Sequence, residues 1–223
     1  AGRPDWESVG VTLCSDIAPF ETMKLRLLNG AHSAIAYVGL AFGYETVAAC
    51  MGDSVIVEYV SRLMIEEISP EVSPPPSVDL SAYVLTLLER FKNPSLHHQC
   101  QQIAIDGSEK IQQRWLPVLA RRLARQSSIS LMAFGLAAWL IYLQKSNEVQ
   151  DPRRVLLQGL FAGKPRALQA STLVFESGIF PSATPHLTKL VSQVGLSLEN
   201  IDAVGAPLAL SELLKAERMD VDS

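Results

Sequence analysis

Residues 129–143, ISLMAFGLAAWLIYL, are fifteen consecutive positions without a charged side chain. A membrane-spanning helix needs about 20 such residues, and the strongly polar segments RRLARQSS and QKSNEVQDPRR lie on either side. An apolar run of this length, bounded by polar sequence, is typical of a helix that is buried on all sides. We therefore predict a core helix here and no segment that crosses a membrane.

A second long helix is predicted near the beginning of the chain. From Pro19 to Phe42, apolar residues recur every three or four positions, which predicts a helix of about six turns. Proline is tolerated in a first helical turn, and Gly43 is suited to end or bend the helix. Upstream, apolar and small or polar residues alternate over residues 9–13, which predicts one short strand.

The rest of the chain also favours helices. Asp53 and Asp79 each precede an apolar segment with helical spacing and are suitable N-caps. Four prolines within residues 70–77 predict an extended connection between packed helices. The predicted fold class is therefore mainly α, in one multi-helical domain.

Charge and cysteine content exclude several classes of function. Nineteen Lys and Arg against 23 Asp and Glu give a formal net charge of -4, whereas nucleic-acid-binding domains usually show a basic excess. Cys14, Cys50 and Cys100 form no CxxC motif, which favours buried or half-buried thiols in a reducing compartment. The first ten residues lack the apolar stretch of a signal peptide. We expect a cytoplasmic protein that binds neither nucleic acid nor membrane.

Motifs that hold nucleotides or metals are missing from the sequence. No GxGxxG follows a predicted strand, and GxxxxGK[ST], HExxH and GxSxG do not occur. No carboxylates, histidines or cysteines cluster at metal-ligand spacing. The chain therefore predicts no metal site and no dinucleotide site of its own.

The strongest candidate for chemistry is MKLRLLNGAHSA, residues 23–34. At about 100° per residue, Lys24 and Asn29 lie roughly 140° apart, and His32 falls between them on one arc of the helix. Arg26 points elsewhere, about 200° from Lys24. A lysine with a lowered pKa can take a hydroxyl proton, an asparagine amide can donate to a developing alkoxide, and a histidine can hold a hydroxyl. A solvent-directed lysine and a core histidine would give the same pattern.

The sequence MKLRLLNGAHSAIAY resembles the mannitol dehydrogenase family of polyol-specific long-chain dehydrogenases. In that family a lysine is followed by an asparagine five residues on and by a histidine three beyond it, which Lys24, Asn29 and His32 match. The segments VDLSAYVLTLLERFKNPSLHH and IAIDGSEKIQQRWLP, within residues 78–117, are also similar to the family. The resemblance covers most of the chain.

The resemblance implies a specific domain organisation. Residues 1–223 would be a single helical domain like the C-terminal region of 6-phosphogluconate dehydrogenase. An N-terminal Rossmann domain, absent from this chain, would bind NAD or NADP. The implied enzyme interconverts a sugar alcohol or aldonate and the corresponding ketose or keto-uronate, and this chain alone is expected to be inactive.

Site roles also follow from the resemblance. Lys24 would be the general acid/base, Asn29 one half of an oxyanion hole, and His32 a substrate ligand near the reacting carbon. Lys110 matches a basic family position and would face substrate hydroxyls, although a solvated lysine at a helix start fits equally well. Where the family commonly has an arginine, this chain has glutamines (Gln99, Gln101 and Gln102), which weakens the case for a uronate substrate.

Two other classes of function remain open at this point. A helical scaffold or oligomerisation module could keep the same fold without catalysis. A small-ligand binding module would need only the polar helix face. An upstream βαβ unit with a glycine fingerprint in the full-length sequence would favour the enzyme.

Overall fold

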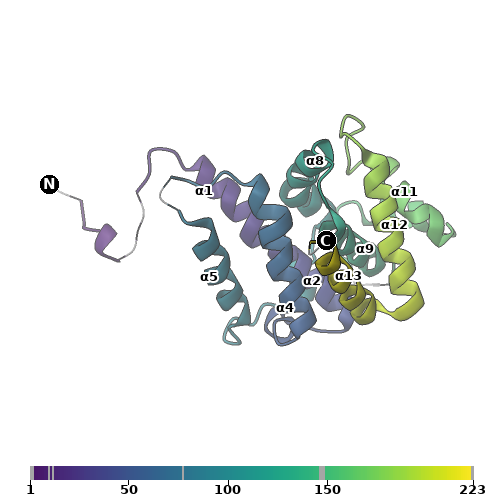
Figure 1. Ribbon diagram of the computed structural model, residues 1–223, viewed down its shortest axis with the longest axis horizontal. Coiled ribbons are helices and arrows are strands. Elements are labelled where there is room, and N and C mark those ends of the chain that lie inside the picture. The colour runs from purple at the N-terminus through teal and green to yellow at the C-terminus, as the bar shows by residue number, and fades with distance from the viewer. Residues whose placement is uncertain (1–2, 10, 12, 77, 146–148, 222–223) are drawn as a thin grey trace.

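The chain is built from α-helices joined by short connections, with the segment before α1 extending away from them (Figure 1). The computed structural model describes residues 3–9, 11, 13–76, 78–145 and 149–221. The α-helices are α1 Ala18–Met23, α2 Gly30–Phe42, α3 Val47–Cys50, α4 Ser54–Arg62, α5 Leu80–Lys92, α6 Cys100–Ile103, α7 Gly107–Lys110, α8 Leu116–Ala124, α9 Ser130–Lys145, α10 Arg154–Phe161, α11 Arg166–Phe175, α12 Leu187–Val204 and α13 Ala206–Val221.

Several short segments have a tighter or wider helical pitch. The 3-10 turns are η1 Glu7–Val9 and η4 Ser69–Glu71, and the π-helical segments are η2 Lys24–Asn29, η3 Leu63–Ile68 and η5 Ile111–Trp115. The ranges described above contain no β-strand element, only an isolated antiparallel bridge between Thr46 and Gln99. The mainly α fold class is confirmed.

Helix α9 is the predicted core helix. Every residue from Leu131 to Leu143 is buried, and α2, α10, α12 and α13 pack around it. Burial on all sides explains why its apolar residues show no preferred face. None of the described helices has the length and apolar character needed to cross a membrane.

The predicted helix ends are largely confirmed. Asp53 caps α4 by accepting from the N–H of Val55 (2.8 Å), and Asp79 caps α5 by accepting from the N–H of Ser81 (2.9 Å). Gly43 ends α2 in the left-handed region (φ 89°), which a glycine adopts without strain.

Two predictions about connecting segments need correction. Residues 70–77 are not wholly extended, because Pro70 and Glu71 belong to the 3-10 turn η4. The strand predicted over residues 9–13 is wrong where the structure describes it, since Val9 closes the 3-10 turn η1 and residues 11 and 13 are in no regular element. Residues 10 and 12 lie outside the described residues. Alternation alone did not make a strand because no described strand pairs with this segment.

The cysteine prediction holds for two of the three thiols. Cys50 and Cys100 are fully buried, with their sulfur atoms 3.6 Å apart, although fifty residues separate them. Gly39 makes room for them, because a Cβ there would stand 2.2 Å from the Cys50 sulfur. Cys14 is exposed, so its predicted burial is wrong. It lies in the segment before α1, outside the packed helices.

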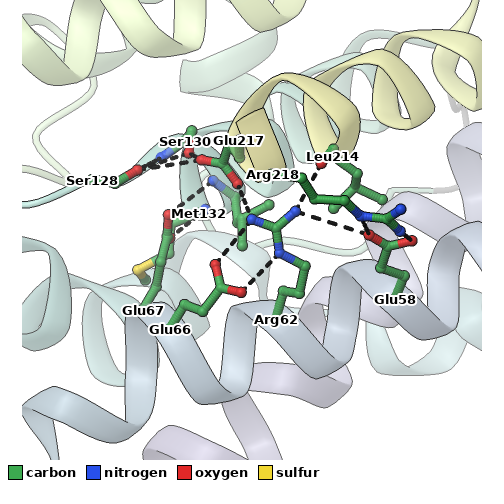
Figure 2. Close-up of polar contacts among 11 residues, drawn as sticks. Glu58, Arg62, Glu66, Glu67, Ser128, Ser130, Met132, Leu214, Glu217 and Arg218 are labelled. Atoms are coloured by element: carbon green, nitrogen blue, oxygen red, sulfur yellow. Dashed lines mark hydrogen bonds and ion pairs between the residues drawn. The ribbon is translucent and has the colours of Figure 1, made fainter. Parts of the chain in front are cut away.

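The last helix is held on α4 by a network of charges centred on Arg62 (Figure 2). The Arg62 Nε donates to Glu66 (2.8 Å), its Nη2 donates to Glu217 (3.1 Å), and its Nη1 donates to the Leu214 carbonyl (2.9 Å). Glu217 also accepts from the Ser130 hydroxyl at the start of α9. Arg62 therefore joins residues more than 150 positions apart and fixes where α13 lies.

A buried carboxylate lies beside this network. Both oxygens of Glu67 accept backbone N–H groups at the start of α9, from Leu131 (3.0 Å) and Met132 (2.8 Å). Glu67 thus caps a helix to which it does not belong, and satisfies donors that would otherwise be unpaired. Burial nevertheless raises the pKa of Glu67 to about 8, against the opposing effect of those two N–H groups.

We expect the stability of the domain to stay nearly level from about pH 4.5 to pH 6.5 and to fall above pH 6.5. The raised pKa of Glu67, about 8, means that the stability it contributes below its ordinary pKa is lost as the pH rises from about 4.5 to 8. The pKa of His32 is lowered to about 4, chiefly by burial and then by His98, so stability is lost as the pH falls below the ordinary histidine value. Between pH 4.5 and pH 6.5 the two effects have opposite signs and nearly cancel, at roughly 3 kcal/mol each, and above pH 6.5 the Glu67 effect alone lowers the stability by roughly 2 kcal/mol.

Chemical denaturation of this domain at pH 4.5, 6.5 and 9 measures the effect. Glu67→Gln should abolish the fall above pH 6.5 and uncover a loss of stability from pH 6.5 to pH 4.5, whereas His32→Gln should give a stability that falls continuously from pH 4.5 to pH 8. An unmodified domain whose stability is level from pH 6.5 to pH 9 would contradict the Glu67 assignment, and a Glu67→Gln variant that is level from pH 4.5 to pH 6.5 would contradict the His32 assignment.

Candidate functional site

The candidate site lies along one continuous helical path made of α1, η2 and α2. The helix predicted from Pro19 to Phe42 is confirmed by this path. Its middle is not α-helical, however, because the N–H of Gly30 reaches back five residues to the carbonyl of Leu25. This wide π-helical turn contains Lys24 and Asn29 as its first and last residues. Single π-helical turns are rare and occur often at functional sites.

The wide turn changes the angle around the helix axis that separates the predicted site residues. In a π-helix the hydrogen bonds join residues five apart, so such residues lie one above the other. Lys24 and Asn29 are five apart, and the turn therefore brings them closer in direction than the 140° or so expected for an α-helix. His32 follows in the first turn of α2, three residues after Asn29.

Lys24 is exposed, and the described residues offer it no hydrogen bond, ion pair or ring contact. It is joined to Asn29 and His32 only through the helix. Arg26 behaves differently, since its Nη1 donates to the carbonyl of Glu71 (3.1 Å) and anchors the helix to η4. The burial that would make Lys24 a base is thus not supplied by the described part of this chain.

His32 lies against an aromatic and basic surface. Its ring stacks on Phe91, with ring centroids 5.3 Å apart and an interplanar angle of 24°. The centroid of the His98 ring lies 5.1 Å from that of His32. The Nε2 atom is buried and has no hydrogen-bond partner. Burial, then His98 and then Arg114 lower the pKa of His32 to about 4, so its imidazole is neutral near pH 7. A neutral ring with one free nitrogen is suited to share a hydrogen bond with a hydroxyl group.

Lys110 is a second basic residue of the candidate site. It is partly buried, at the end of α7, and its Nζ donates to the carbonyl of Ile103 (3.0 Å). Its positive charge acts on His32, which places the two in one neighbourhood. Burial and then Arg114 lower the pKa of Lys110 below its ordinary value. Lys110 is therefore near enough to His32 for their charges to interact, while Lys24 is exposed to solvent.

Sequence reasoning missed several residues of this neighbourhood. Arg114 donates from Nη1 to the Asn29 carbonyl (3.1 Å) and to the Ser33 hydroxyl (2.7 Å), and the Trp115 Nε1 donates to the Gly30 carbonyl (3.1 Å). Both lie more than eighty positions from their partners, which no periodicity reveals. His98 sits in the HHQCQQ segment, where the adjacent histidines were the only signal.

Comparison with known proteins shows which family the chain is similar to. The mannitol dehydrogenase C-terminal domain family matches residues 16–201. The chain belongs to the mannitol dehydrogenase family. That match includes Lys24, Asn29, His32 and Lys110, together with all helices from α1 to α11.

Individual members of the mannitol dehydrogenase family are similar over nearly the whole chain. D-mannonate oxidoreductase of Escherichia coli (strain K12) is 39% identical over 92% of this chain and 43% of its own length. Mannitol dehydrogenase DSF1 of Saccharomyces cerevisiae (strain ATCC 204508 / S288c) is 34% identical over 96% of this chain and 43% of its own length.

A solved structure shows the same fold. Mannitol 2-dehydrogenase of Pseudomonas fluorescens, in a ternary complex with NAD and D-mannitol, superposes with a TM-score of 0.86 at 34% identity, covering 96% of this chain and 44% of that chain. This chain therefore spans less than half the length of the relatives it matches.

The glutamines that stand where the family commonly has an arginine differ in their surroundings. Gln101 donates to the Tyr142 hydroxyl (3.1 Å), and Gln99 and Gln102 are exposed. Among the described residues, no three His, Cys, Asp or Glu side chains are grouped so that they could hold a metal ion.

Proposed function

We propose that this chain is the catalytic and substrate-binding domain of an NAD(P)-dependent oxidoreductase. Its reaction interconverts a sugar alcohol or aldonate and the corresponding ketose or keto-uronate, in the cytoplasm. The observation that carries the proposal is the wide turn that presents Lys24 and Asn29 together, one helical turn before His32, in a member of the mannitol dehydrogenase family.

The proposed residue roles follow from what each side chain can exchange. The Lys24 amine, when neutral, takes the proton of the substrate hydroxyl. The Asn29 side-chain amide donates to the oxygen as negative charge develops on it. The free Nε2 of His32 holds a hydroxyl next to the reacting carbon, and Lys110 binds hydroxyls farther along the substrate. When bound, the nicotinamide cofactor supplies the hydride acceptor.

The cofactor would be held mainly by a second domain. A dinucleotide's pyrophosphate is bound where a glycine-rich turn links a strand to a helix. The described residues form no such strand, so we assign the nucleotide to another domain. The exposure of Lys24 agrees with this division, because a Rossmann domain placed over η2 would remove solvent from the proposed base.

The test is a screen of the full-length protein against mannitol, arabinitol, mannonate and altronate, with NAD and with NADP. We expect turnover of at least one of the four with one cofactor. The 223-residue chain alone should neither turn over these compounds nor bind NADH. Micromolar NADH binding to the isolated chain in calorimetry would contradict the domain assignment, and a full-length protein inactive on all four would contradict the substrate class.

A further inference from the structure

Two neighbouring side chains of η5 donate hydrogen bonds to two neighbouring carbonyls of the helical path made of α1, η2 and α2. The Arg114 Nη1 donates to the carbonyl of Asn29 (3.1 Å), and the Trp115 Nε1 donates to the carbonyl of Gly30 (3.1 Å). These two carbonyls lie at the junction where the wide turn η2 ends and α2 begins. The segment η5 is therefore hydrogen-bonded to this helical path at the junction where the path changes from π-helix to α-helix.

The donating side chains are themselves immobilised. Trp115 is 1% exposed and meets the edge of Tyr37, with ring centroids 5.9 Å apart. It also fills the space at Gly135 of α9, where a Cβ would stand 2.9 Å from its ring. Arg114 is fixed at a second point by its bond to the Ser33 hydroxyl (2.7 Å). The donors thus belong to the rigid core, not to a mobile surface.

Arg114 is an unusual choice for a merely structural contact. It is partly buried, its Nε is buried without a partner, and the described side chains give it no carboxylate partner. Removing a guanidinium from water without a counter-charge is unfavourable. What the side chain supplies in return is the two N–H groups of its Nη1, which lie in the guanidinium plane and donate to the Asn29 carbonyl and the Ser33 hydroxyl.

We propose that Arg114 is a positioning residue that acts through Asn29: by holding the Asn29 peptide at the end of the wide turn, it aims the Asn29 side-chain amide at the reacting oxygen. The inference rests on the proposed function, because it assigns Asn29 its role there. Trp115 supports the same junction from the next carbonyl. Displacement of a donor by about 1 Å is enough to lower a reaction rate about 10²-fold.

A double-mutant cycle in the full-length enzyme tests the coupling. Arg114→Met should lower kcat by about 10- to 100-fold and change the affinity for the cofactor by less than about twofold. In the Asn29→Ala background the same change should lower kcat by less than about threefold, because the donor that Arg114 aims is already gone. Equal losses in the two backgrounds would overturn the proposal.

Two further outcomes separate this proposal from the proposed function. If Asn29→Ala alone leaves kcat unchanged, the role of Asn29 fails and the positioning inference fails with it. If Asn29→Ala lowers kcat and Arg114→Met adds its full loss on top, only the positioning inference fails. Gln113→Ala, an exposed change in the same turn, is the control and should leave kcat unaltered.

A second variant covers the case in which Arg114→Met does not fold. Arg114→Lys keeps the charge, but its side chain is shorter and its rotating ammonium does not hold two donors in one plane. It should lose less kcat than Arg114→Met, and again only while Asn29 is present. Trp115→Phe, which removes one donor and keeps the ring, should give a smaller loss of the same kind. If Arg114→Lys lowers kcat as much in the Asn29→Ala background as it does when Asn29 is present, the proposal is also overturned.

Discussion

In the full-length protein, Lys24→Ala should lower the rate of alcohol oxidation by about 10²–10⁴-fold, because it removes the group that we propose as acceptor of the hydroxyl proton. Lys24 is exposed and makes no hydrogen bond or ion pair with the described residues, so the change should leave the fold of this domain intact. Steady-state kinetics with a substrate found in the screen measure the loss. Cofactor affinity should change little, and an added primary amine should restore part of the rate.

The pH profile gives a second reading of the same variant. Oxidation should speed up as one group loses its proton, and that rise should vanish in Lys24→Ala. Lys24→Arg keeps the positive charge but is not a usable base near neutral pH, so it should be nearly as slow.

The structure changes which control is suitable for Lys24. Arg26, two residues away, holds the Glu71 carbonyl and is therefore part of the helix's anchoring. Lys215, an exposed lysine of α13, is a cleaner control, and Lys215→Ala should keep full activity. Equal losses for the Lys24 and Lys215 variants would mean that Lys24 has no special chemical role.

Asn29→Ala should reduce turnover by about 10²–10³-fold, because one donor to the developing alkoxide is lost. The loss should fall on kcat more than on KM, since the bond strengthens as charge develops on the oxygen. Asn29→Asp tests the sign of the interaction. It keeps the shape of the side chain but replaces the donor with a carboxylate, and it should be at least as slow as Asn29→Ala.

The matched control for Asn29 is Asn200, an exposed asparagine of α12. Asn200→Ala should be indistinguishable from the unmodified enzyme in both kcat and KM. If Asn29→Ala raises KM and leaves kcat unchanged, Asn29 is a ground-state binding group and the oxyanion role is wrong.

Much of the fold could be predicted from the sequence because local rules decide it. An uncharged run too short for a membrane has only a protein core in which to lie, and α9 occupies that core. Asp53 and Asp79 cap their helices through contacts within three residues, which a local pattern captures. The strand expected at residues 9–13 failed because a strand needs a partner, and alternation cannot say whether one is present.

The candidate site was only partly predictable, for a related reason. The motif identifies Lys24, Asn29 and His32. The angles between them around the helix axis depend on the π-helical turn, however, and an analysis that assumes 100° per residue cannot detect that turn. The carbonyls at the end of that turn accept hydrogen bonds from Arg114 and Trp115, which lie 85 positions away in the sequence. The basic surroundings of His32 likewise come from α5, α7, η5 and the connection before α6. Such contacts are tertiary, and residue spacing carries no record of them.

The position of the last helix has a consequence for synthesis on the ribosome. Helix α13 packs on α2 and α4, and Glu217 completes the charge network that begins at Arg62. Until residue 217 has left the exit tunnel, α2, which carries His32, lacks part of its cover. Domains generally fold as units as the chain emerges, so this domain becomes whole only after α13 has been translated. A ribosome stalled before α13 would hold a chain with an open core and exposed apolar surface, the kind of nascent chain that chaperones bind.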